Sequence, residues 1–414
     1  AKFGTTQIAL LSIAQVGALT TTGIADLADT QIRAFAVTQL NAMSSTNVNA
    51  LTETQFAALT STQIAGLSTT QAGILSATNI AAMTTTQAGA LTATQLGRLT
   101  SEALIAFDAT QFAAFSATQV RALTTTQIGN LEAADIAEFT TTQIAGLATT
   151  QVRGLTETAV AALAATQIAA LTVPQIQSLS TTSLVGFADT QIGALTTTQI
   201  GGLLAPQVSA FGATTVAALA ATQISAMSAT QIAALGSTNF AALDSTQIGA
   251  LTTTQMRSLT TSQIASIDAG QVSSFTTTQL TQLSGTQLKS LSTSNLSALD
   301  TTQMGALTAT QIASLTTTQI AGLVAGDIGE MTTTQVQALV TAQVASLTTE
   351  AVSALTTTQV GAMRTTQIQG LTATQLGALD ATDIGEFTTT QLQSLTTTQV
   401  AGLTSTNAQS LSTQ

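Results

Sequence analysis

The sequence repeats with a period of eight residues along its whole length. A clean unit is Thr316–Leu323, which reads TTTQIAGL, and its positions are called slots a to h. Slot h holds a large apolar residue at every eighth position from Phe3 to Leu411, without an insertion or a deletion. The chain therefore contains 51 full units from Gly4 to Leu411. Such an array predicts a solenoid, in which each turn covers the apolar face of the previous one.

Two slots hold most of the bulky apolar side chains and so predict the core. Slot e is usually Ile or Val, slot h is usually Leu, and all 12 Phe and all 7 Met occupy one of these two slots. In a strand, residues three apart point to opposite faces, so slots e and h would separate. In one continuous helix, eight residues overshoot two turns by roughly 80°, so the apolar stripe would wander. The chain must therefore bend once in every octad.

The remaining slots indicate a short capped helix. Slot a is mostly Thr, Ser or Asp and slot d is mostly Gln, which is the pattern of a capping box. Slots f and g are mostly small residues, which permit close packing. We expect a helix of about six or seven residues in each octad. Pro174 and Pro206 both occupy slot c; because proline disfavours a helical residue before it, the helix could begin at slot b.

The predicted fold is an α-solenoid of these octads, a single continuous domain over residues 1–414 without an internal boundary. The alternative is a β-solenoid with two octads per coil. Threonine-rich slots and stacked Gln or Asn side chains favour strands. Slot d also never contains Glu, although a capping box accepts Glu as readily as Gln.

Composition excludes several kinds of function. The chain has no Cys and no His, so thiol nucleophiles, disulfides, ordinary zinc or haem sites and a Ser-His-Asp triad are impossible. Only 8 basic residues stand against 19 acidic ones, for a net charge of −11, which argues against nucleic acid as a partner. No apolar run approaches the roughly 18 residues of a membrane span. We expect no enzymatic activity and no cofactor.

Three units depart from the pattern by carrying acids in slots d and g. Acids at these spacings lie on one side of a helical turn, and clusters of oxygen ligands suit Ca²⁺. We therefore regard the units as candidate calcium sites, with the alternative that the acids only cap helices and face solvent. The candidate residues are Glu132, Asp135, Glu138, Asp327, Glu330, Asp380, Asp383 and Glu386.

The threonine slots are the other candidate surface. Rows of hydroxyl groups could bind ice or a glycan, or carry O-linked glycans, and one N-x-S sequence occurs at Asn295–Ser297. The simpler interpretation is that these threonines cap helices and face solvent.

The unit Thr316–Leu323 resembles the Thr/Ala/Gln-rich repeat regions of bacterial secreted and cell-surface proteins, adhesin-like or filament-forming. This resemblance is compositional and covers the whole chain. It implies an extracellular or surface-located structural protein that forms a rod, fibre or sheath by self-association. The alternative class is a binding module, with ice, a glycan or Ca²⁺ as its ligand.

Overall fold

The computed structural model describes residues 3–411, and helices are the regular secondary structure of this range. It contains 51 helices, one in each octad, and no strand. The α-solenoid prediction is confirmed, and the alternative of a β-solenoid is wrong. The slot pattern thus folds as short capped helices despite its many threonines.

The helix boundaries follow the slots. Each helix begins at slot b and ends at slot e, f or g, so that it contains four to six residues; α18 (Thr141–Gly146) is an example. The exceptions are α30 (Gly236–Phe240), which begins at slot a, and α51 (Ser405–Leu411), which has seven residues. The helices are slightly shorter than we expected because slots h and a are extended.

The corner between octads and the predicted capping box are both visible at α18. Leu147 in slot h (φ −59°, ψ 142°) and Thr140 in slot a (φ −70°, ψ 158°) both lie outside the helical region. The backbone N–H of Gln143 donates to the Thr140 hydroxyl at 3.2 Å. The Thr140 N–H in turn donates to Oε1 of Gln143 at 2.7 Å. This reciprocal pair satisfies two N–H groups that a helix start would otherwise leave unpaired.

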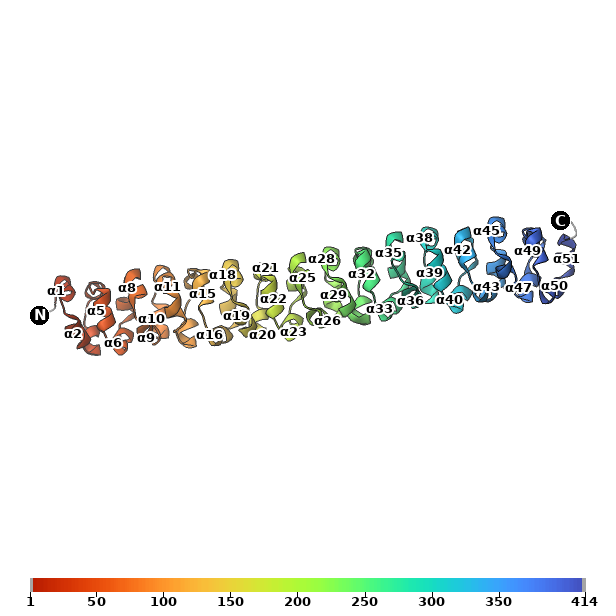
Figure 1. Ribbon diagram of the computed structural model, residues 1–414. Helices are drawn as coiled ribbons and strands as arrows, with labels where there is room; N and C mark the ends of the chain where they lie inside the picture. Colours follow the sequence, from red (N-terminus) through yellow and green to blue (C-terminus); the bar gives the residue numbers. More distant parts are fainter. Residues whose placement is uncertain (1–2, 412–414) are drawn as a thin grey trace. The chain divides into compact units, whose positions relative to one another are not determined.

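The chain forms two compact units, which divide between Ala210 and Phe211. In each unit the helices stack turn upon turn (Figure 1). A helix packs against the one three places further along: α2 (Ile13–Gly17) on α5 (Val37–Ala42), and α29 (Ala229–Ala234) on α32 (Thr253–Ser258). The octad continues in register past Ala210, and the expectation of a single domain without a boundary stays a prediction.

Glutamine side chains in slot d connect one turn of the solenoid to the next. Nε2 of Gln39 donates to the carbonyl oxygens of Leu11 at 2.8 Å and Ile8 at 3.1 Å, four octads earlier. The N-terminal end of a helix therefore contacts the C-terminal end of the helix four places earlier. The side of the same helix packs on the helix three places earlier. One turn takes more than three and fewer than four octads.

The core consists of the two apolar slots, as the sequence predicts. Ile320 in slot e has no exposed surface and Leu323 in slot h is only 2% exposed. Slot d lies at the edge of this core, and Gln319 is 3% exposed. In slots f and g the backbones approach closely: a Cβ atom added to Gly97 would lie 2.8 Å from the carbonyl oxygen of Ala122. Across residues 3–411, every helix is too short or too polar to cross a bilayer.

Candidate functional site

The three acidic units lie in separate turns, and their slot-d aspartates replace glutamine in the capping box. Oδ2 of Asp135 accepts the Glu132 N–H at 2.7 Å, and Oδ2 of Asp383 accepts the Asp380 N–H at 3.0 Å. Asp327 accepts the N–H of Val324 at 2.9 Å. These carboxylates therefore act as caps at helix starts, where a negative charge is favoured.

Asp327 is the most buried acid of the three units. It is 6% exposed, and the Ser297 hydroxyl donates to its Oδ2 at 2.8 Å from the turn below. Together with the cap bond from Val324, this contact gives Oδ2 two hydrogen bonds. The interaction with Ser297 replaces the bond that a glutamine amide makes to backbone carbonyls elsewhere.

The slot-g glutamates reach back to slot b of the helix three places earlier. Oε1 of Glu330 accepts the Thr301 hydroxyl at 2.6 Å, and Oε1 of Glu386 accepts the Thr357 hydroxyl at 2.8 Å. For Glu138 the residue in the corresponding position is Ala109, which offers no hydroxyl. The third glutamate thus lacks the threonine donor that the other two possess.

Glu138 is also the acid with the least favourable surroundings. Its Oε2 is buried without a hydrogen-bond partner among residues 3–411, as is Oε2 of Glu386. Burial raises the pKa of Glu138, and the nearby negative charges of Asp135 and Asp108 raise it further. At Asp108 itself, hydrogen bonds from the Thr110 side chain and from the Gln111 N–H lower the pKa.

The candidate calcium sites do not assemble into a coordination sphere. No three acidic side chains in the described range come together as a group that could hold a metal ion. The residues Glu132, Asp135 and Glu138 belong to the first compact unit, and the other five belong to the second. The calcium hypothesis stays a prediction, and this geometry gives it no support.

The threonines of slots b and c face solvent. In the unit Thr316–Leu323, Thr317 and Thr318 are exposed, whereas Thr316 is half-buried and caps the helix by accepting the Gln319 N–H at 3.1 Å. The capping role of slot a is confirmed. Binding of ice or glycans by the exposed hydroxyl groups, and their glycosylation, stay predictions.

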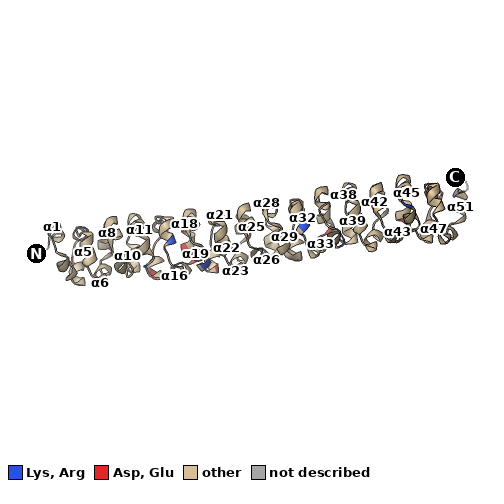
Figure 2. Ribbon diagram, in the orientation of Figure 1, with Lys and Arg blue, Asp and Glu red and all other residues tan. Residues whose placement is uncertain are grey.

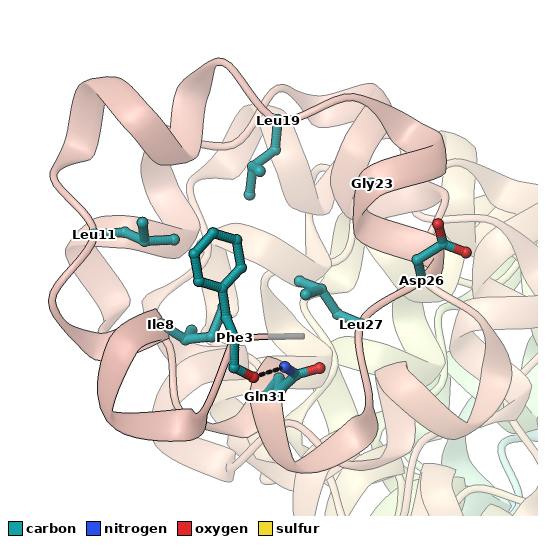
Figure 3. A pocket seen from close by; sticks show the side chains of 8 residues that line it. All are labelled: Phe3, Ile8, Leu11, Leu19, Gly23, Asp26, Leu27 and Gln31. Carbon is teal, nitrogen blue, oxygen red and sulfur yellow. Dashed lines mark hydrogen bonds between the residues drawn. The ribbon is translucent and has the colours of Figure 1, made fainter. Parts of the chain in front are cut away.

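The first turn of the first unit presents an open apolar hollow that sequence reasoning did not identify (Figure 3). It has a volume of about 510 Å³, and it is lined by Phe3, Ile8, Leu11, Leu19, Gly23, Asp26, Leu27 and Gln31. Phe3 is 53% exposed, and its carbonyl oxygen accepts a hydrogen bond from Nε2 of Gln31. The slot-h side chains of this turn are therefore less covered than those from Phe35 to Phe387, which are buried.

The glutamines next to this hollow have unused donors. Gln7 and Gln15 cap their helices through Oε1, which accepts the N–H of Gly4 at 2.7 Å and of Ser12 at 2.8 Å. No carbonyl among residues 3–411 accepts a bond from either Nε2, in contrast to Gln39 in the next turn. The hollow and these amides together form an exposed surface. Between later turns, the corresponding surface is buried.

Comparison with known proteins finds a similar repeat. Six segments match the family model of the ALTTAQ repeat, and they are residues 24–61, 216–253, 232–261, 240–277, 282–317 and 320–357. The name corresponds to slots g, h, a, b, c and d, as in Ala250–Gln255, which reads ALTTTQ. The chain is thus similar to ALTTAQ repeats in both compact units. No curated protein matches the sequence.

Proposed function

We propose that this chain is a structural protein that associates with copies of itself into a filament, sheath or surface fibre outside the cell. The uniform octads support this proposal, because no insertion interrupts the array to form a loop or cleft. Most exposed slots hold small or uncharged residues, and charged residues are sparse along the ribbon (Figure 2). A solenoid of this kind serves as a regular building element.

The observation that carries the proposal is the bond that joins one turn to the next. Nε2 of Gln143 donates to the carbonyl oxygen of Phe115 at 2.9 Å, and Nε2 of Gln319 donates to that of Leu291 at 2.8 Å. Because the same contact recurs between successive turns, each unit is a regular element that suits repeated assembly.

The test is electron microscopy of the purified chain. We expect filaments from the unmodified chain. Single particles at high concentration would contradict the proposal.

A further inference from the structure

The acidic residues recur with the length of one solenoid turn. Hydrogen bonds between adjacent turns join residues 25 to 31 positions apart. In the first unit, five acidic residues follow one another at intervals close to the length of one turn or of two turns. They therefore lie one or two turns apart on one side of the unit, which we call the acidic column. It consists of Asp26, Glu53, Asp108, Asp135 and Asp189.

Contacts between turns confirm that these helices are stacked. The carboxylate of Glu138 lies close enough to Asp108 and Asp135 for both charges to raise its pKa. The helix α17 (Ala133–Ala137) packs on α20 (Glu157–Ala161). Nε2 of Gln191, on α24 (Asp189–Gly193), then donates to the carbonyl oxygen of Leu163 at 2.7 Å, directly after α20. Of the other acids of the unit, Asp29, Glu132 and Glu138 lie within three residues of a member of the column. The remaining two, Glu102 and Glu157, each follow an arginine by four residues.

Three arginines form a second column on a different side of the same unit. Arg121 lies midway in the sequence between Asp108 and Asp135, which places it half of one turn from each. Arg98 follows Gly97, whose backbone packs on the carbonyl of Ala122, next to Arg121. The three side chains Arg98, Arg121 and Arg153 are exposed, and we call them the basic column.

The third arginine belongs to the next turn of this column. Gln151, on the same helix as Arg153, donates through Nε2 to the carbonyl oxygens of Val120 and Leu123 at 3.0 and 2.8 Å. These two residues flank Arg121. The basic column therefore advances one turn at a time, like the acidic column.

The second unit repeats the arrangement. Four of its nine acids, Asp244, Asp300, Asp327 and Asp383, again follow one another at intervals of one or two turns. Its three exposed cations are Arg257, Lys289 and Arg364. The first two lie on adjacent turns, because Nε2 of Gln287 donates to the carbonyl oxygen of Met256 at 3.0 Å. Arg257 follows Asp244 by about half of a turn, as Arg121 follows Asp108.

We propose that these columns form a side-to-side interface between two copies of the chain, with the basic column of one against the acidic column of the other. The inference rests on the proposed function, since it describes how neighbouring copies would associate within a fibre. Both columns advance with the same repeat, so aligning one pair of opposite charges aligns the pairs in the adjacent turns. The net charge of −11 makes copies repel in most orientations. Contact of the basic column of one copy with the acidic column of the other is attractive, which favours this orientation.

The experiment measures pairing of the chain by sedimentation. We expect pairs at about 0.02 M salt and single chains at about 0.5 M, because exposed charges are screened within a few ångströms at high salt. Adding Arg98→Gln/Arg121→Gln/Arg153→Gln should raise the dissociation constant at low salt about tenfold or more. The corresponding Arg→Lys variant keeps the charges and should pair as before.

A matched pair of single substitutions tests the position of the charge. Arg121→Gln removes a cation from the basic column, whereas Arg33→Gln removes one from the same slot f beside Asp29. Only Arg121→Gln should weaken pairing. Single chains at low salt, or pairs that neither salt nor the arginine substitutions affect, would overturn the proposal. Failure of the unmodified chain to form filaments would count against the proposed function alone, because pairing is measured separately.

Discussion

At the scale of single residues, the slot-d glutamine explains why the repeat tolerates so little change there. Gln143 accepts the Thr140 N–H through Oε1, and its Nε2 donates to the carbonyl oxygens of Phe112 at 2.6 Å and Phe115 at 2.9 Å. A glutamate could accept the first bond but could not donate the others. Where slot d is Asn, a donor remains: Nδ2 of Asn47 reaches the carbonyl oxygen of Leu19 at 2.6 Å.

Only half of this double role is predictable from the sequence. The spacing of slots a and d predicts the capping bond correctly, because that contact is local. Judged from one octad alone, the absence of Glu from slot d favours strands. In the folded chain, the slot-d side chain donates to carbonyl oxygens of the previous turn, such as that of Phe115, and a glutamate could not do so. A bond between turns cannot be derived from one octad without knowing the length of the turn.

Gln143→Glu tests this role. We expect the substitution to destabilise the neighbouring turns by about 2 kcal/mol or more, because two buried carbonyls lose a donor and face a carboxylate. Thr142→Glu adds the same charge at the exposed slot c and should have little effect. Hydrogen exchange of the amides in residues 112–147 measures the local stability. Equal protection in both variants would contradict the assigned role.

Glu138 gives a prediction about pH. Its pKa is raised in the folded chain by burial and by Asp135 and Asp108, so folding favours the protonated form. The ionised carboxylate therefore lowers the free energy of unfolding at neutral pH. This penalty disappears as the pH falls through the raised pKa towards the ordinary value of 4.5. Glu138→Gln should stabilise the chain at pH 7, with no gain at about pH 4.

Ala109→Thr provides an independent check of the same environment. The new hydroxyl would take the place that Thr301 and Thr357 have opposite Glu330 and Glu386. We expect it to stabilise the ionised form of Glu138 and to reduce the benefit of Glu138→Gln. Denaturant unfolding at several pH values measures both effects. A gain from Glu138→Gln that does not depend on pH would contradict this explanation.

At the scale of the element, each helix is too short to be stable alone and depends on its caps and neighbours. The sequence predicts the position of the helix well, because capping residues, prolines and apolar slots all act locally. It predicts that slots f and g must be small, but it does not show which glycines are essential. That depends on which backbone of the next turn lies opposite.

Two glycines, Gly97 and Gly193, both in slot f, distinguish essential from dispensable positions. A Cβ atom at Gly97 would lie 2.8 Å from the carbonyl oxygen of Ala122, whereas one at Gly193 would have no atom within 4 Å. Gly97→Ala should therefore destabilise the chain by about 1–3 kcal/mol. Gly193→Ala should be neutral or stabilise it by up to about 1 kcal/mol, because alanine favours helix. Equal changes in unfolding free energy would show that the backbones do not approach at Gly97.

At the scale of the whole molecule, the period of eight and the identity of the core slots predict a helical solenoid correctly. The number of octads per turn cannot be predicted, since it depends on the angle at which neighbouring helices pack. The sequence identifies the three acidic units as irregular, but their aspartates act as caps. The columns of opposite charge cannot be recognised from the sequence, because their spacing has no meaning until the length of a turn is known.

The most direct test of the account is a disulfide between neighbouring turns, for which the chain offers a background without cysteine. A Cβ atom at Gly89 would lie 3.5 Å from the Cβ of Ala114 in the next turn, which suits a disulfide. In the alternative of two octads per coil, residue 89 would instead lie beside Ile105, in the same slot two octads later. We expect Gly89→Cys/Ala114→Cys to form the bond on mild oxidation and Gly89→Cys/Ile105→Cys to remain reduced. The opposite result would contradict a turn of between three and four octads.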